Sequence, residues 1–246
     1  MTQALIRKLK QLARPLQATP LHPQWLAGTD AAYLLRQIKN IPAGSVVIDV
    51  GCANKWPRSQ IDSSCHYIGF DLYETATNWY HTKPDVFGDA SVIPFASNSM
   101  DVALLLDVLE HVPDTNRVLS EIHRALKKSG ILIVKMPFLY PLHDEPRDYV
   151  RLTTHGFRCA AESLGYSVTS EHPQGSPIVT AALLMNIALA RTVVVCAANK
   201  NPLCVPLVLL APLIFLGANL FAKLLSLMTP PDSTMSFSNV VIMRKN

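Results

Sequence analysis

Two carboxylates and a glycine stand where predicted β-strands end. The first predicted strand, residues 46–50, is an apolar, β-branched run typical of a strand buried on both faces; it carries Asp49 and is followed by Gly51. A second strand over 66–70 leads to Asp71, twenty residues after Gly51. The carboxyl ends of parallel strands form a ligand-binding edge, and a carboxylate at this separation suits ribose hydroxyl groups. The spacing favours a cofactor-binding turn, with an ordinary strand-to-helix turn as the alternative.

Strands and helices alternate along most of the sequence. Strands are predicted over residues 46–50, 66–70, 85–88, 102–106, 131–136, 166–170 and 236–244. Helices are predicted over residues 29–39, 57–61, 115–127 and 156–164. Repetition of strand, helix and strand at this spacing predicts right-handed crossovers and a parallel α/β sheet. Asp89 follows the third strand, where it is either a ligand-binding carboxylate or a cap of the turn.

The composition narrows the class of protein. The chain has 246 residues and a net charge of +4, and only 16% of its residues are charged, so no broad basic face for a nucleic acid is predicted. A mean hydropathy of +0.21 indicates that some segment is unusually apolar. The five cysteines form no C-x-x-C pair and no zinc-binding spacing, which favours reduced thiols in a cytosolic compartment and predicts no metal site.

Two segments have the composition of membrane-associated helices. Residues 1–28 begin with a basic amphipathic pattern, which suits either an anionic membrane surface or packing over the mouth of an active site. Only three residues are charged between positions 178 and 228. The apolar stretches 178–198 and 205–222 approach the roughly 20 residues that a helix needs to cross a bilayer. Residues 176–230 are therefore predicted to form a membrane-associated hydrophobic hairpin that spans the bilayer or lies in its surface; a helical lid or a dimer interface is the soluble alternative.

Four stretches between residues 45 and 136 resemble, in order, the five motifs of the class I S-adenosylmethionine-dependent methyltransferases, with the third and fourth motifs in one stretch. They are VIDVGCA, IGFDL, GDASVIPFASNSMDVALLLDVLEHV and LKKSGILIVKMP. The resemblance implies a doubly wound, mostly parallel sheet of seven strands, in which residues 29–175 form the core and residues 231–246 supply an antiparallel last strand, with the hairpin as an insertion. One departure is Ala53, which stands where the family usually has a second glycine.

The resemblance also implies S-adenosyl-L-methionine as cofactor. Asp71 is implied to bind the ribose hydroxyls, Leu72 to flank the adenine and Asp89 to accept a hydrogen bond from the adenine amino group. The first turn is implied to line the methionine end, and the backbone near Leu106 to meet the amino-acid portion. The cofactor-binding residues implied in this way are Asp49, Gly51, Ala53, Asp71, Leu72, Asp89, Ala90, Leu106 and Asp107.

The segment after the fifth strand, residues 137–153, is dense in aromatic and ionisable side chains. Its pattern, P-x-x-x-P-x-H-x-x-P-x-D-Y-x-R-x-T, resembles a methyltransferase branch associated with surface-polysaccharide and glycolipid assembly. His143 is the candidate general base and Asp148 the residue that orients it. Arg151 is the candidate for binding a carboxylate or phosphate of the acceptor, unless it forms only a structural ion pair with Asp148. His111 either touches cofactor or substrate or satisfies a loop carbonyl.

Together these features predict a methyltransferase at the cytoplasmic face of a membrane. Its expected acceptor is an oxygen, or secondarily a nitrogen, of a lipid-linked or glycan-related molecule, with no nucleic acid partner. Two alternatives remain open: methylation of a soluble or isoprenoid small molecule, and a cofactor-binding protein without turnover. A nicotinamide dehydrogenase is disfavoured because the first turn lacks the three-glycine phosphate-binding pattern. The sequence does not indicate which oligomeric state the protein adopts.

Overall fold

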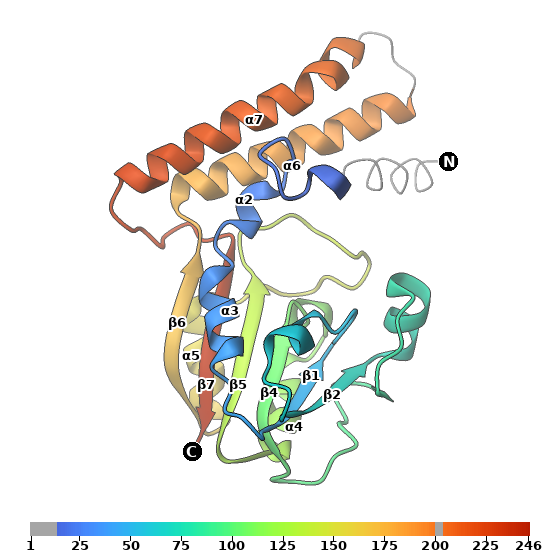
Figure 1. Ribbon diagram of the computed structural model, residues 1–246, viewed down its shortest axis with the longest axis vertical. Helices are drawn as coiled ribbons and strands as arrows, with labels where there is room; N and C mark the ends of the chain where they lie inside the picture. Colours follow the sequence, from blue (N-terminus) through green and yellow to red (C-terminus); the bar gives the residue numbers. More distant parts are fainter. Residues whose placement is uncertain (1–13, 200–203) are drawn as a thin grey trace. The chain divides into compact units, whose positions relative to one another are not determined.

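A computed structural model describes residues 14–199 and 204–246 and contains a seven-stranded sheet (Figure 1). The strand order is β3-β2-β1-β4-β5-β7-β6. The pairs β3–β2, β2–β1, β1–β4 and β4–β5 are parallel, and β7 is antiparallel to β5, which confirms the predicted fold class. The strands are β1 (Val46–Val50), β2 (His66–Asp71), β3 (Val86–Phe87), β4 (Met100–Leu106), β5 (Leu126–Pro137), β6 (Tyr166–Gln174) and β7 (Ser238–Lys245).

Helices cover both faces of this sheet because its central strands are apolar on both sides. Val47 in β1 and Leu104 in β4 pack in one cluster with α3 (Ala32–Lys39). The next residue of each strand belongs to a second cluster, together with α4 (Thr115–Ala125) and α5 (Thr154–Ser163). Alternate strand residues point to opposite faces, and each fully buried side chain of this size contributes about 1.5–3 kcal/mol. The sheet is therefore a rigid platform for the turns at its edge.

The register of the strands brings the ends of β1, β2 and β4 to one edge. Val50 is aligned with Phe70 of β2 and with Leu105 of β4. The next residue along the chain is Gly51 after β1, Asp71 at the end of β2 and Leu106 at the end of β4. These three residues therefore leave the sheet side by side. This edge carries the turns in which the sequence placed the cofactor.

Several element boundaries differ from those predicted. Helix α4 ends at Ala125 rather than at residue 127, because Leu126 has extended dihedral angles and already pairs with Met100 as the start of β5. Strand β3 has only two residues, which pair with the end of β2. The π-helical turn η3 (Thr75–Tyr80) was not predicted. The remaining short elements are η1 (Arg14–Leu16), α2 (Trp25–Gly28), η2 (Trp56–Gln60) and η4 (Leu109–His111).

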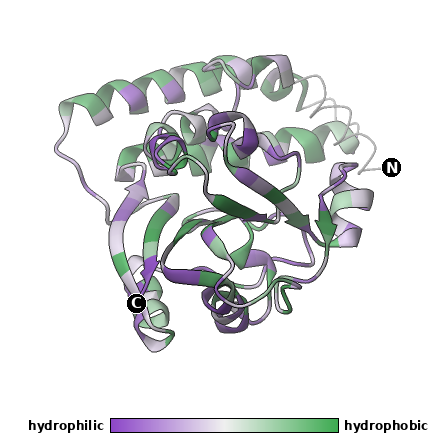
Figure 2. Ribbon diagram, turned by 60° about the horizontal axis from the view of Figure 1, so that its bottom comes forward, coloured by the Kyte–Doolittle hydropathy of each residue, from purple (hydrophilic) through white to green (hydrophobic). Residues whose placement is uncertain are grey.

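The chain divides into two compact units, and the smaller one contains the predicted hairpin. In the described part of the chain this unit comprises residues 14–31, 174–199 and 204–237; the other comprises residues 32–173 and 238–246. Helices α6 (Pro177–Ala198) and α7 (Val205–Met228) are apolar along most of their length (Figure 2). Each is long and apolar enough to cross a membrane. The amphipathic pattern predicted over residues 1–14 lies, except for Arg14, outside the described residues.

Polar contacts inside this unit hold the two helices to each other and to the preceding chain. The side-chain amide of Asn186 in α6 donates to the amide oxygen of Asn219 in α7 at 2.9 Å, and both side chains are buried. Cys196 and Cys204 form a disulfide, so the expectation of reduced thiols is wrong for this pair; Cys52, Cys65 and Cys159 are free. Two cysteines with seven residues between them match no sequence motif for a disulfide. The bond depends on the packing that brings the ends of α6 and α7 together.

Candidate active site

A cavity of about 820 Å³ opens at the carboxyl edge of β1, β2 and β4. Its wall comes from the turns that follow these strands, from η3 and from the segment after β5. The nine residues for which the sequence implied cofactor contacts all line it: Asp49, Gly51, Ala53, Asp71, Leu72, Asp89, Ala90, Leu106 and Asp107. The turns therefore converge on one space.

Gly51 occupies a position where a side chain would be both strained and crowded. Its φ of +75° lies in the left-handed region, where a side chain is strained. A Cβ atom added there would also lie 2.3 Å from Cγ2 of Val108, in the turn after β4. The glycine thus allows two neighbouring turns to pack closely at the cavity.

Two backbone N–H groups, one from the turn after β1 and one from the residue after β2, hold the carboxylate of Asp71. Its Oδ2 accepts a 2.9 Å hydrogen bond from the N–H of Ala53, and its Oδ1 accepts a 2.7 Å bond from the N–H of Leu72. The residue is only 4% exposed, and burial raises the pKa of its carboxyl above the usual value. Each carboxylate oxygen retains a further acceptor site, so Asp71 can receive the two hydroxyls of a ribose.

Asp49 is a second buried carboxylate at the same edge. Burial raises its pKa to about 6, while the hydrogen bond that the Tyr67 hydroxyl donates to its Oδ2 acts in the opposite direction. Tyr67 lies two residues before Gly69, the strand partner of Asp49. Tyr67 was not predicted as a site residue, because a side chain on the neighbouring strand becomes a partner only once the register is known.

The other predicted cofactor residues lie on more exposed turns. Asp89 accepts a 2.7 Å hydrogen bond from the N–H of Ser91, so it both caps its own turn and lines the cavity. Asp107 follows β4 with a φ of +56° and pairs with Lys135 of β5, whose Nζ lies 2.7 Å from its Oδ1.

Aromatic side chains and the segment after β5 line the cavity opposite these turns. Trp79 and Tyr80 of η3 line it together with Arg147. Arg147 forms an ion pair with Glu74, and its guanidinium carbon lies 6.0 Å from the centre of the Trp79 ring. The sequence analysis did not single out these η3 residues, although two adjacent aromatics after a strand end were a signal for a ligand-contacting turn.

The three predicted catalytic residues form one cluster that does not line the cavity. Arg151 donates two hydrogen bonds to Asp148, one of them 2.8 Å long, and this contact lowers the pKa of Asp148 to about 2. Oδ2 of Asp148 accepts from the backbone N–H of His143 at 3.0 Å and lies 3.3 Å from its Nδ1. The Asp148–Arg151 ion pair raised as an alternative is therefore present, and Asp148 also fixes His143.

Behind the cavity wall, His143 meets two residues from the turn after β4. Its Nε2 lies 3.6 Å from Oε1 of Glu110, and Nε2 of His111 lies 3.7 Å from the same oxygen. The Glu110 carboxylate raises the pKa of His143 above its usual value. Of these three residues only His111 lines the cavity.

Comparison with known proteins finds similarity to methyltransferases in part of the chain. Residues 48–134 match the methyltransferase domain family. A tRNA (carboxymethyluridine(34)-5-O)-methyltransferase of Schizosaccharomyces pombe is 34% identical over 100 residues, which cover 38% of this chain and 42% of that protein. A sterol 24-C-methyltransferase of Gibberella zeae is 29% identical over 124 residues, covering 46% of this chain and 32% of that protein. The chain thus spans less than half the length of either relative.

Solved structures agree at the level of the fold. An S-adenosylmethionine-dependent methyltransferase from Mesorhizobium loti superposes with a TM-score of 0.53 at 14% identity, covering 89% of this chain and all of that one. An identity this low shows the fold alone. Residues 48–134 thus match a methyltransferase domain and lie within a fold that solved methyltransferases share.

Proposed function

We propose that this protein transfers a methyl group from S-adenosylmethionine to an oxygen of a lipid-linked or glycan-related acceptor, while α6 and α7 are held in a membrane. The observation that carries the methyl-transfer proposal is the convergence of Asp49, Asp71 and Asp89 on one cavity at the edge of β1, β2 and β4. Carboxylates suit this cofactor. Its ribose hydroxyls and adenine amino group donate hydrogen bonds, and its positive sulfonium favours a negatively charged neighbour.

The acceptor is proposed to enter on the side of the cavity formed by the segment after β5. Arg147 and Tyr149 line that side, and His111 lines the wall behind which Glu110 and His143 lie. We assign the activation of the acceptor to this group of three residues. Asp148 and Arg151 act as positioning residues, since they fix His143 and do not line the cavity. Methyl transfer itself requires mainly proximity and alignment of oxygen, carbon and sulfur.

The exposed surface of α7 supports the membrane location. Leu209, Leu213, Leu220, Leu224 and Leu227 follow helical spacing and are 49–73% exposed. A continuous apolar stripe of this size is a liability in water and marks a surface that binds lipid or protein. We commit to a lipid bilayer as the partner, because the length and apolarity of α6 also match a membrane helix.

Two known relatives act on different classes of acceptor by name, one a tRNA and one a sterol. The shared region therefore carries the cofactor chemistry and does not define the acceptor. A tRNA acceptor is disfavoured here because only 16% of residues are charged and nucleic-acid affinity depends on many phosphate contacts.

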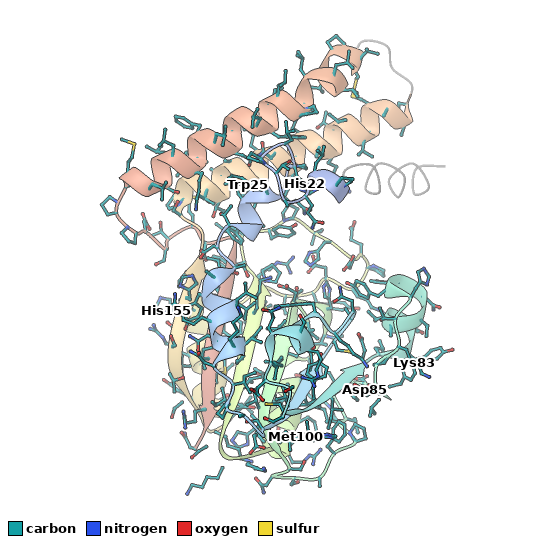
Figure 3. All side chains as sticks on the ribbon, in the orientation of Figure 1. His22, Trp25, Lys83, Asp85, Met100 and His155 are labelled. Atoms are coloured by element: carbon teal, nitrogen blue, oxygen red, sulfur yellow. A yellow bond between two sulfur atoms is a disulfide. The ribbon has the colours of Figure 1, made fainter. Side chains whose placement is uncertain are left out.

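Cofactor binding by the full-length protein in detergent tests the proposal directly. Isothermal titration with S-adenosylmethionine should give saturable binding, and Asp71→Ala should weaken it at least tenfold because the ribose loses its acceptor. Asp85→Asn is the matched control. Asp85, labelled in Figure 3, binds the N–H of Gly69 and Lys55 near the same edge but does not line the cavity. Equal affinity in wild type and Asp71→Ala, or no binding in either, would falsify the proposal.

The acceptor and the membrane partner need separate measurements. Mass spectrometry of lipids and glycans from cells lacking the protein should reveal a species lighter by one methyl substituent; an unchanged profile argues against this acceptor class. A protein that binds cofactor yet yields no product with any extract is a cofactor-binding protein without turnover. Flotation with phospholipid vesicles should carry the full-length chain but not a variant in which residues 177–228 are replaced by a short polar linker. Full activity of that variant on a soluble substrate would favour the small-molecule alternative.

A further inference from the structure

A buried carboxylate meets two imidazole rings behind the cavity wall. The Glu110 side chain is fully buried, and among the described residues neither of its oxygens has a hydrogen-bond partner. Its Oε1 faces Nε2 of His111 at 3.7 Å and Nε2 of His143 at 3.6 Å. These distances exceed those of a hydrogen bond. A buried carboxylate without hydrogen bonds is costly unless a cation compensates it.

The three donor atoms lie close enough together to converge on one metal ion. One ligand atom from each of Glu110, His111 and His143 lies within 4.8 Å of the other two. Ligands of a tetrahedral zinc ion, with bonds of about 2.0–2.1 Å, stand roughly 3.3 Å apart. The two distances to Oε1, 3.7 and 3.6 Å, are a few tenths of an ångström longer than this. The widest separation in the cluster, up to 4.8 Å, has to close by about 1.5 Å, so the two imidazole rings move toward each other when an ion binds.

The outer nitrogen of each imidazole is held by a group typical of the second shell of a metal site. Nδ1 of His111 hydrogen-bonds the carbonyl oxygen of Arg147. Nδ1 of His143 lies at hydrogen-bond distance, 3.3 Å, from the carbonyl oxygen of Pro141, and it is equally far from Oδ2 of Asp148, which Arg151 fixes. A histidine that donates from Nδ1 to a carbonyl or carboxylate presents the lone pair of Nε2 to a metal. Both Nε2 atoms here face the same Glu110 oxygen.

We propose that Glu110, His111 and His143 bind one divalent metal ion through Oε1 and the two Nε2 atoms. Two histidines and one carboxylate are a ligand set used at catalytic zinc and iron sites, where coordination positions stay open for water or substrate. The bound ion compensates the buried carboxylate. It also links the turn after β4 to the segment after β5.

The site adjoins the cavity, since His111 belongs to its wall. If the proposed methyl transfer holds, Glu110, His111 and His143 would hold the ion, and the ion would supply the positive charge that lowers the pKa of an acceptor hydroxyl. The hydroxyl proton passes to solvent, the oxygen bonds to the methyl carbon, and the bond from that carbon to sulfur breaks with its electrons left on sulfur. Metal binding itself needs neither cofactor nor acceptor, so it is tested separately.

The test uses the full-length protein, stripped with a chelator and then dialysed against Zn²⁺ or Mn²⁺ alone. Metal content is measured by mass spectrometry of the digested protein. We expect one ion per chain in wild type and at least tenfold weaker binding in Glu110→Gln and His143→Asn. His155→Ala is the matched control, because His155 is an exposed histidine on α5 outside the cluster (Figure 3). It should bind as wild type does.

Thermal unfolding of the same proteins separates a lost site from a lost fold. The metal should raise the unfolding temperature of wild type and His155→Ala but not of Glu110→Gln, whose amide keeps the shape of the side chain and removes its charge. If wild type binds neither ion at millimolar concentration, or if both cluster variants bind as wild type does, the metal site is overturned. If Glu110→Gln still binds S-adenosylmethionine, cofactor binding does not depend on the metal site. The metal site and the methyltransferase proposal are then tested independently.

Discussion

The backbone N–H of Ala53 donates a 2.9 Å hydrogen bond to Asp71 while Ala53 itself holds a left-handed φ of 42°. The position that departs from the family pattern is thus a strained one, because a methyl group stands where a glycine would be unstrained. The strain is maintained by the buried carboxylate that the N–H binds. The turn keeps its form in spite of the alanine.

Ala53→Gly should therefore increase stability without weakening cofactor binding. Relief of the left-handed strain outweighs the greater freedom of glycine in the unfolded chain, so we expect the free energy of unfolding to rise by about 0.5–1 kcal/mol. Chemical denaturation followed by circular dichroism measures this change. Ala160→Gly in the ordinary helix α5 is the control and should lower stability by about as much. A decrease in both variants would show that Ala53 is not strained.

Cofactor affinity should depend on the ionisation of Asp49. Its pKa of about 6 means that the carboxyl is mostly neutral below that pH and mostly charged above it. A sulfonium prefers the charged form, so S-adenosylmethionine should bind more tightly as the pH rises through 6. Tyr67→Phe removes a hydrogen bond that lowers this pKa, so it should move the midpoint to higher pH. Titration calorimetry across the pH range measures both, and an unchanged pH dependence in Asp49→Asn would contradict the assignment.

The pairing of Arg147 with Glu74 should slow the release of cofactor. The contact joins the segment after β5 to the residues just before η3, on the rim of the cavity. Both side chains are partly exposed, so we expect Arg147→Ala to change stability by less than about 1 kcal/mol and to raise the dissociation rate several-fold. Stopped-flow displacement measures that rate. Arg158→Ala removes an ion pair with Glu171, and since neither of these residues lines the cavity, it should leave the dissociation rate unchanged.

Asn219 should fix the chain before α3 to the hairpin. Its side-chain amide donates to the carbonyl oxygens of Pro20 and His22 at 2.7 and 3.0 Å and accepts from Asn186. Asn219→Leu leaves these buried groups without partners, at a cost of about 1–3 kcal/mol for each unsatisfied group. Hydrogen exchange of amides in residues 19–27 should become faster. Ser226→Ala, on the same helix, should leave exchange in that segment as it is; equal protection in both variants would refute the role.

The sequence determined the fold and the cofactor edge because both depend on local patterns. Predominantly apolar runs of five or six residues defined the central strands, and acidic residues at or just after the strand ends had to emerge at one edge once those strands lay parallel. Asp49, Asp71 and Asp89 were found in this way. The apolar stretches of α6 and α7 were equally visible, since membrane length and lack of charge are properties of composition.

Tertiary structure alone decided which side chains meet from distant parts of the chain. Glu110 and His143 are thirty-three residues apart and share no motif spacing, so their approach depends on the path of the segment after β5. The same holds for Tyr67 with Asp49, which needs strand register, and for Arg147 with Glu74. The sequence placed His143 at the acceptor, whereas in the structure His111 lines the cavity and His143 lies behind it. Local patterns specify elements, but a contact a few ångströms long is set by the packing of all of them together.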